Sequence, residues 1–143
     1  MTADPSFCFD FDSENKIFRT RFHGPVTDDS LKYCYHVWES VASRSDASVL
    51  RAAIADFSEA TSFHVTRDTI RELAALQPAD PIVSRPRIIV APNPLIFFLA
   101  WLFQLLGRRT RPNVHVVHTL AEAFALLGVT ATHFEPFEPK LPA

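Results

Sequence analysis

Hydroxyl and imidazole side chains surround a short polar stretch near the middle of the chain, and they are the residues best suited to chemistry. Ser58 and Thr66 stand at its two ends, with His64 and Arg67 beside Thr66. Phosphorylation of either hydroxyl would add roughly −1.5 to −2 charge at a helix start, and His64 could act as a general base. Turn and cap roles explain the same hydroxyls, and no nucleophile pairs with His64. The sequence therefore favours structural roles, with a switch or partner-binding loop of Ser58, His64, Thr66 and Arg67 as the alternative.

Two histidines near the carboxyl-terminal third invite a metal-site hypothesis, which their spacing argues against. His115 and His118 lie three residues apart in a short apolar run. In a strand such residues face opposite sides of the sheet, and no Cys or Asp supplies further ligands at a helpful spacing. The chain has three glycines, too few for a glycine-rich phosphate loop. We therefore predict no metal, no cofactor and no enzymatic activity.

Residues 60–118 carry seven arginines. Arg108, Arg109 and Arg111 follow one predicted helix, Arg85 precedes a predicted strand, and Arg87 is the first residue of that strand. Gathered at one end of a sheet, they would bind a phosphate, a lipid head group or the acids of a partner, although a solvated surface is the commoner explanation. The hypothesis of an anion-binding patch rests on Arg108, Arg109 and Arg111. The net charge of −2 gives no general attraction to nucleic acid.

The segment from Leu95 to Leu106 is unusually apolar for a surface helix, since Gln104 is its single polar residue. At about 100° per residue, one side should face the sheet and the other should face outward. The expected inward set is Leu95, Leu99, Leu102 and Leu106, and the expected outward set is Phe97, Ala100, Trp101 and Gln104, with Leu105 on a flank. Aromatic residues on an outer face indicate that something covers them.

Three alternatives remain for what covers this outer face. A second copy of the chain would form a symmetric dimer, and this is the favoured one, with Phe97, Trp101, Gln104 and Leu105 as the interface. A C-terminal tail carrying Phe134 and Phe137 could fold over the helix. A membrane interface would take the aromatic face and place the neighbouring arginines at the lipid head groups.

Hydrophobic periodicity predicts alternating strands and helices. Strands are expected over residues 6–12, 17–22, 50–57, 87–91 and 114–118, and helices over residues 27–42, 66–76, 94–106 and 120–127. The first two strands form a hairpin at the sheet edge, broken after Phe22 by His23, Gly24 and Pro25. Gly107 and Gly128 are expected to close the last two helices. The order is therefore β-β-α-β-α-β-α-β-α.

Length and composition fit one ordinary globular domain. The chain has 143 residues, of which 48% are hydrophobic and 21% charged, so a single domain over residues 1–143 is expected. Its core spans about residues 6–128, and residues 129–143 form an extended tail. The longest apolar run has twelve residues, fewer than the roughly 20 needed to cross a bilayer. Two unclustered cysteines and no evident signal peptide favour a cytoplasmic location.

The strand ending in Asp56, Phe57 and Ser58, the loop and capped helix after it, and the final alanine-rich helix resemble the STAS domains. The resemblance is closer to the SpoIIAA-like branch of small bacterial proteins, also compared with lipid-binding SEC14 domains, and covers about residues 6–128. It implies a single-domain α/β fold with a mixed sheet and about four helices. In STAS anti-sigma-factor antagonists, one of two paired serines after this strand is a phosphorylation switch. Here Val65 takes the place of the first serine, which implies that the phosphoserine switch does not work.

These observations predict a non-enzymatic regulatory or binding module. It would act by protein–protein contact through the helix at Thr66 and the apolar helix around Trp101, as a homodimer or with a regulatory protein partner. The alternative is a carrier or sensor of a lipid or other small apolar ligand, as the SEC14 comparison implies, with membrane association. That alternative requires a cavity between the Leu95–Leu106 helix and the sheet, lined by Phe and Leu side chains.

Overall fold

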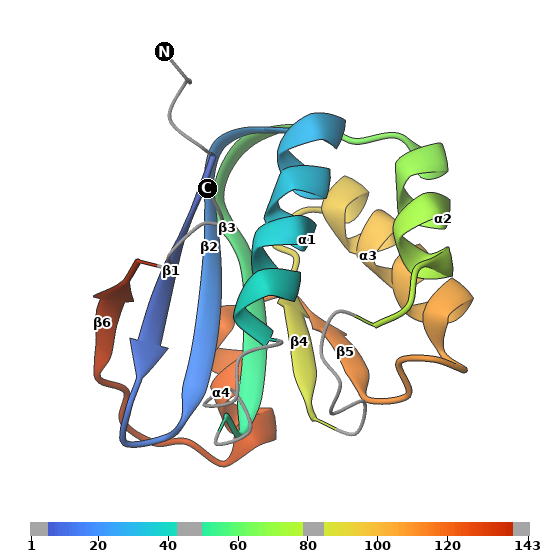
Figure 1. Cartoon of the computed structure of the whole chain (residues 1–143). Helices are drawn as coiled ribbons and strands as arrows, with labels where there is room; N and C mark the ends of the chain where they lie inside the picture. Colours follow the sequence, from blue (N-terminus) through green and yellow to red (C-terminus); the bar gives the residue numbers. More distant parts are fainter. Residues whose placement is uncertain (1–5, 43–49, 79–84, 139–143) are drawn as a thin grey trace.

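The computed structural model describes residues 6–42, 50–78 and 85–138. They form one mixed six-stranded sheet and four helices (Figure 1). The elements follow in the order β1 (Phe7–Asp12), β2 (Ile17–Thr27), α1 (Asp28–Ala42), β3 (Ala52–His64), α2 (Arg67–Ala75), β4 (Arg87–Val90), α3 (Pro94–Gly107), β5 (Val114–Val117), α4 (Leu120–Leu127) and β6 (Phe134–Phe137). This order differs from the expected one by the final strand. An α/β fold with a mixed sheet and four helices was expected from the sequence.

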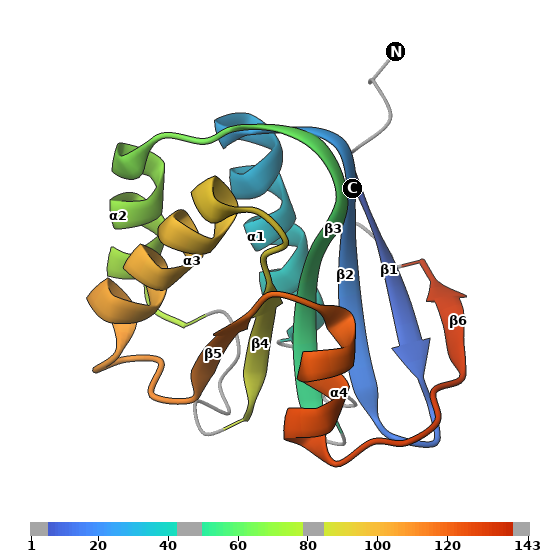
Figure 2. The same ribbon diagram turned by 180° about the vertical axis from the view of Figure 1, so that it is seen from behind.

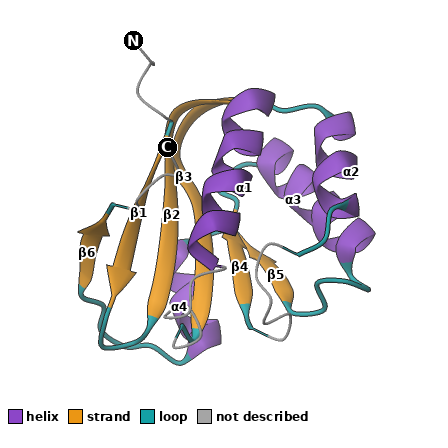
Figure 3. Cartoon of the chain, in the orientation of Figure 1, coloured by secondary structure: helices purple, strands orange, loops and turns teal. Residues whose placement is uncertain are grey.

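The strands lie side by side in the order β5-β4-β3-β2-β1-β6. β2 to β5 are parallel to one another, whereas β1 and β6 run antiparallel to their neighbours. From β2 to β5, each strand lies next to the one before it in the chain, always on the same side. Crossovers of this kind are almost always right-handed, so α1, α2 and α3 lie on the same face (Figures 1 and 3). α4 follows the last parallel strand and covers the opposite face (Figure 2).

β2 and β3 continue well beyond their expected ends. The expected break at His23, Gly24 and Pro25 is wrong, because β2 passes through these residues with two register shifts against β3. Gly24 makes this possible with a φ of +66°, a conformation that costs glycine little. The expected loop after Phe57 is also wrong, since β3 runs on to His64. We call the paired ends His23–Thr27 and Glu59–His64 the β2–β3 arm; it curves away from the sheet towards α1 and α2 (Figure 1).

The expected extended tail contains a further strand. β6 pairs with β1, from Phe9 opposite Phe137 to Asp12 opposite Phe134. The β1–β2 hairpin is therefore not at the edge of the sheet. The ring of Phe137 lies 5.4 Å from that of Phe18, far from α3 across the sheet order. The hypothesis that Phe134 and Phe137 cover the outer face of α3 is thus wrong; residues 139–143 of the predicted tail lie outside the described residues.

Capping residues fix the helix starts as the sequence indicates. The side chains of Thr66, Asn93 and Thr119 accept hydrogen bonds from backbone N–H groups three residues later, at 3.2, 2.9 and 3.2 Å. Such caps satisfy N–H groups that have no partner inside the helix. Gly128 ends α4 in the left-handed region with a φ of +69°. Gly107, expected to close the preceding helix, is instead the last residue of α3 itself, and Arg108 caps it.

Two apolar clusters hold the domain together, one on each face of the sheet. The cluster beneath α1 and α3 is aromatic and includes Phe7, Phe9, Phe18, Phe22 and Phe57. The cluster beneath α4 is aliphatic and includes Ile17, Ile54, Ile88 and Val90. The alternation of side chains along a strand sends successive residues to these two clusters.

Candidate ligand-binding cavity

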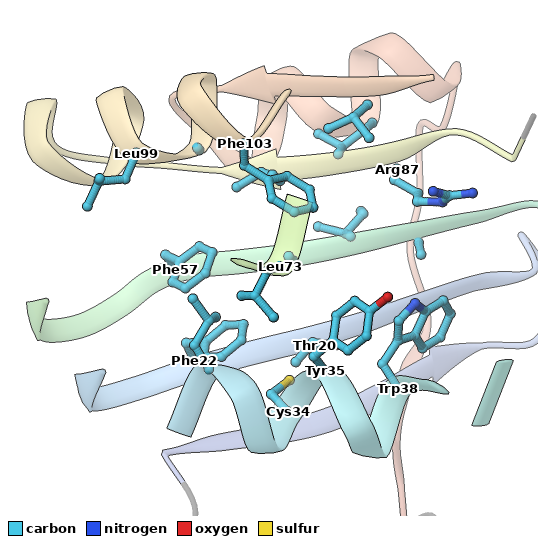
Figure 4. Close-up of a pocket in the computed structure, with 18 of the residues that line it drawn as sticks. Thr20, Phe22, Cys34, Tyr35, Trp38, Phe57, Leu73, Arg87, Leu99 and Phe103 are labelled. Atoms are coloured by element: carbon cyan, nitrogen blue, oxygen red, sulfur yellow. The ribbon is translucent and has the colours of Figure 1, made fainter. Parts of the chain in front are cut away.

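A cavity of about 200 Å³ lies between the sheet and the three helices α1, α2 and α3 (Figure 4). Its lining is largely apolar and aromatic. The residues that contribute include Phe18, Thr20, Phe22, Leu31, Cys34, Tyr35, Trp38, Ala53, Ala55, Phe57, Phe63, Ile70, Leu73, Arg87, Ile89, Ile96, Leu99, Ala100, Phe103, Arg111 and Val114. The cavity that the carrier hypothesis requires, between the Leu95–Leu106 helix and the sheet, is therefore present.

Small side chains at the centre of the sheet form its floor. Strand pairing places Thr20, Ala55 and Ile89 in one row across β2, β3 and β4, and Ala53 lies in the row before it. All four face the helices, because their neighbours Ala52 and Ile54 belong to the cluster beneath α4. An alanine at the centre of a sheet reaches only a short way towards a covering helix, so space remains above Ala53 and Ala55.

The position of α2 leaves that space open. α2 packs against α3 and, less extensively, α1, and makes few contacts with the strands. The β2–β3 arm carries the starts of α1 and α2 away from the sheet before each helix begins (Figure 1). α2 consequently covers the cavity from a distance, with Ile70 and Leu73 directed to its interior.

Polar contacts hold α2 at its amino-terminal end. The Asp28 carboxylate accepts hydrogen bonds from the backbone N–H of Thr66, at 2.8 Å, and from its hydroxyl, at 3.2 Å. Burial alone raises the pKa of Asp28, but hydrogen bonds from Thr66 and Thr69 lower it below its ordinary value. One turn further on, Lys32 of α1 forms a 3.1 Å salt bridge with Glu72. These contacts tie α2 to the start of α1.

Arg111 holds the other end of α2. Its guanidinium donates hydrogen bonds to the carbonyls of Leu73, Ala74 and Leu76, at 3.3, 3.1 and 3.0 Å, and to the Tyr35 hydroxyl at 3.3 Å. Tyr35 in turn donates to the Gln77 carbonyl at 2.5 Å. A cation at a helix carboxyl end is favoured by the helix dipole and by the unpaired carbonyls there.

The predicted anion patch does not form on one surface. Arg108 and Arg109 are exposed, but Arg111 is 4% exposed and directed at the end of α2. Arg85 is equally buried. The sequence places these residues close together, but it does not show which way each side chain points after the turn. Arg87, the first residue of β4, also lines the cavity.

Arg87, Tyr35 and Trp38 lie towards one end of the cavity, whereas Phe22, Phe57 and Leu99 lie towards the other (Figure 4). Strand register explains this division. Arg87 shares a row with Ala53 and Phe18, and the Trp38 ring packs 5.1 Å from that of Phe18. Phe22 and Phe57 stack at 4.3 Å, closer to the carboxyl ends of the same strands. The cavity therefore has a polar end and an apolar end.

Cys34 lies on the wall contributed by α1 and is fully buried. Burial raises the pKa of its thiol well above the ordinary value, so the sulfur stays protonated near neutral pH. A protonated, apolar-packed thiol is not a nucleophile. In the described residues there is also no group of three or more His, Cys, Asp or Glu side chains that could hold a metal ion.

The residues of the predicted switch loop are divided between β3 and the start of α2. Ser58 is in β3, where its hydroxyl and backbone N–H donate to Asp56 Oδ1 at 2.5 and 2.9 Å. Six residues of strand, at about 3.3 Å each, separate it from His64 by about 20 Å. Thr66 caps α2, and the Arg67 guanidinium lies 5.5 Å from the centre of the Phe98 ring. The structure thus brings Thr66 and Arg67 to α2, whereas Ser58 lies elsewhere.

The outer side of α3 is apolar, but its members differ from the expected ones. Leu95, Phe98, Trp101, Leu105 and Leu106 are 53, 40, 45, 40 and 48% exposed. We call the stripe of Leu95, Phe98, Trp101 and Leu105, spaced three or four residues apart, the α3 ridge. Among the expected inward residues, Leu95 and Leu106 are exposed, Leu102 is half-buried and Leu99 is buried.

The expected outward residues are divided as well. Trp101 belongs to the α3 ridge, but Ala100 is buried. Gln104 is half-buried and donates to the Val114 carbonyl of β5 at 2.7 Å, and Phe97 stacks on His118 at 4.3 Å. An almost uniformly apolar helix gives little periodicity to orient it. The contact of Gln104 with β5 rotates the helix away from the expected setting.

A comparison with models of known protein families found no match, and a comparison with curated proteins found none either. The resemblance to STAS and SpoIIAA-like domains accordingly stays a prediction.

Proposed function

We propose that this protein binds a small, largely apolar molecule in the cavity beneath α2 and α3, as a carrier or a sensor. The observation that supports this proposal is the cavity itself, lined largely by apolar side chains from α1, α2, α3 and the sheet. Ligand sites in proteins are concave and mostly apolar, with a few placed polar groups. No covalent chemistry is required of the lining, and the protonated Cys34 thiol offers none.

Occupation of the cavity should stabilise the folded protein. A molecule that binds the folded state and not the unfolded chain raises the free energy of unfolding in proportion to its concentration and affinity. A rise in Tm on addition of a small apolar compound is therefore the expected sign of binding.

The first test is binding of octan-1-ol, measured by calorimetry and by the rise in Tm. We expect the wild type to bind it and to gain stability. Ala55→Leu, which fills the floor of the cavity, should weaken binding by more than about tenfold, because its added methylenes occupy the ligand's space. Ala125→Leu places the same change on an exposed position of α4 and should bind normally. Equal binding by the two variants, or none by the wild type, would contradict the proposal.

A second candidate function is supported by the α3 ridge. Its four exposed apolar side chains form one stripe, and contiguous apolar surface of this kind marks contact sites. We propose that it contacts a second copy of the chain, so that the module also acts through protein–protein contact. We also propose that the protein is located in the cytoplasm. In the part of the chain that the structure describes, no helix has the length and apolarity to cross a membrane.

Light scattering of the wild type and Trp101→Asp tests this second candidate. We expect a dimer for the wild type and a monomer for the variant, because a carboxylate in the ridge would be buried without a partner. Leu126→Asp, at a 57% exposed position of α4, should remain a dimer. A monomeric wild type would contradict the dimer; flotation with liposomes would then show whether the ridge meets a lipid surface instead.

A further inference from the structure

We propose that the ligand of the cavity is a neutral molecule with a carbonyl or hydroxyl oxygen near its middle, which accepts a hydrogen bond from the Thr20 hydroxyl. This inference rests on the proposed function and deepens it, since it names the chemistry of the ligand. The apolar parts of the ligand would lie on either side of Thr20, towards Phe22 and Phe57 in one direction and towards Trp38 in the other (Figure 4).

Thr20 is a deeply buried polar residue on the floor of the cavity. Of the buried polar residues in the described parts of the chain, Thr20 and Arg111 line the cavity, at 8% and 4% exposure. The Arg111 guanidinium donates to carbonyls of α2 and to the Tyr35 hydroxyl. The Thr20 hydroxyl, by contrast, makes no hydrogen bond to any residue that the structure describes. A buried hydroxyl without a partner costs free energy, which a ligand oxygen bonded to it would recover.

The side chains around Thr20 explain why its hydroxyl has no protein partner. Phe9 of β1 and Ala55 of β3 are its neighbours across the strands. Phe18 and Phe22 precede and follow it on the same side of β2. None of these four side chains has a hydrogen-bonding atom. Ala55 is also short, so the hydroxyl lies beside open space and is left for a group that enters the cavity.

The charged groups of the lining favour an uncharged ligand. Among the described residues that line the cavity, none carries a carboxylate, so a cationic ligand would have no counter-charge there. The Arg111 guanidinium is occupied at the end of α2, and Arg87 has an interaction of its own within the protein. An ionic group would therefore lose its hydration in an apolar space without gaining a new ion pair, which is costly.

Cavity volume limits the ligand to about one ring. A cavity of about 150 Å³ lined by apolar side chains binds benzene, and the volume here is about 200 Å³. That leaves room for a ring with a short substituent. Because Thr20 lies between Phe18 and Phe22 along β2, the ligand oxygen should lie between the ring and the substituent. Acetophenone, whose carbonyl joins a ring to a methyl group, has this form.

Calorimetry with two probes of the same shape tests the assignment. Acetophenone and α-methylstyrene differ in one group, since a methylene in the second replaces the carbonyl oxygen of the first. Thr20→Val removes the hydroxyl and keeps the branched shape of the side chain. We expect it to lower the affinity for acetophenone, relative to that for α-methylstyrene, about fivefold, as the loss of one neutral hydrogen bond predicts.

Two further variants locate the effect. Thr20→Ser keeps the hydroxyl and should keep the wild-type ratio of the two affinities. Thr61→Val makes the same change as Thr20→Val at an exposed position of the β2–β3 arm and should also keep that ratio. Thermal unfolding of each variant shows that it is folded, and retained binding of α-methylstyrene shows that the cavity is intact.

Urea unfolding without ligand gives an independent measurement. Thr20→Val should unfold at the same urea concentration as the wild type or a higher one, because no hydrogen bond within the protein is lost. A clear fall of the urea midpoint would show that the Thr20 hydroxyl has a partner inside the protein, and would overturn the inference.

The two proposals fail in different ways. An unchanged ratio of the two affinities in Thr20→Val would overturn the hydrogen bond to Thr20 and leave the apolar site standing. Failure of both probes to bind the wild type would overturn the proposed function, and the assignment of the ligand with it.

Discussion

The two faces of the sheet are packed in different ways although the same strands form both. α4 lies directly on β3, β4 and β5, and Ile88, Val90 and Ala123 beneath or within it are 0–1% exposed. On the other face α2 does not pack directly on the strands, and a cavity lies above Ala53 and Ala55. One face is tightly packed, and the other contains a cavity.

The length of the strand before a helix can decide where that helix sits on the sheet. α4 begins directly after the short strand β5 and a capping threonine, so it folds back at once onto the sheet. α1 and α2 begin only after the β2–β3 arm has left the sheet (Figure 1). The cavity therefore follows from strand length as much as from the small side chains on its floor.

The largest effect should come from the buried ion pair on the α4 side. The Asp10 carboxylate forms salt bridges with Arg19 and Arg21 at 2.7 Å each, and its side chain is 5% exposed. Asp10→Ala leaves both guanidinium groups without this carboxylate and should lower the free energy of unfolding by about 3 kcal/mol, measured in urea. Glu59→Ala removes the exposed end of the same network, 3.4 Å from Arg21, and should cost less than about 1 kcal/mol. Equal losses would contradict the difference in burial.

Neighbouring alanines on opposite faces provide the sharpest comparison. Ala52 is fully buried beneath α4, whereas Ala53 borders the cavity. Ala52→Leu should destabilise the protein by about 2 kcal/mol, because a packed core has no room for the added methylenes. Ala53→Leu should stabilise the ligand-free protein by about 1 kcal/mol by filling the cavity. Urea unfolding of both variants measures the contrast, and destabilisation of similar size in each would show that the cavity side is packed as tightly as the other.

The smallest effect should appear in acid. Burial raises the pKa of Asp12, but hydrogen bonds from Asn15, His133 and Glu14 lower it more, to below its ordinary value of 3.8. The pKa of Asp28 on the α2 side is lowered as well. A carboxylate whose pKa is lowered in the folded state stabilises that state when the pH is above the ordinary pKa. This stabilisation is lost as the pH falls from the ordinary pKa through the lowered one.

We therefore expect the urea midpoint to fall as the pH drops below about 4. Asp12→Asn and Asp28→Asn should each be less stable than the wild type at neutral pH and lose less on acidification. The same slope in the wild type and both variants would assign the acid loss to other carboxylates.

Much of the fold follows from the sequence, because its signals are local. Alternating Phe and polar residues mark β1, and the caps Thr66, Asn93 and Thr119 mark helix starts that the structure shows. The far half of β3 did not look like a strand, since Glu59, Thr61 and His64 are polar. In the described residues, the pairing of β3 with β4 ends at Asp56. The side chains from Ser58 to His64 are exposed or half-buried, so this half of the strand needs few apolar residues.

The candidate site was harder to predict than the fold. A cavity between the apolar helix and the sheet was expected for a carrier, but the polar end at Arg87 was not. One signal was available: Arg87 alternates with Ile89 in a strand that is otherwise apolar, and so faces the same side. Pairing with Ala53, and hence a place beside the cavity, depends on strand register, which sequence alone does not give. The inward turn of Arg111 depends on where α2 ends in space.

The four residues of β6 also bear on solubility. Without them β1 would be an edge strand, and one side of its six-residue backbone would be unpaired. The alternating rings of Phe7, Phe9 and Phe11 would lie along that edge. Such an edge is a template for edge-to-edge association between molecules. β6 replaces it with a shorter strand that contains Pro136, a residue with no N–H to offer an incoming strand. By covering the edge of β1, β6 thus disfavours edge-to-edge association of the sheets of two molecules at this side.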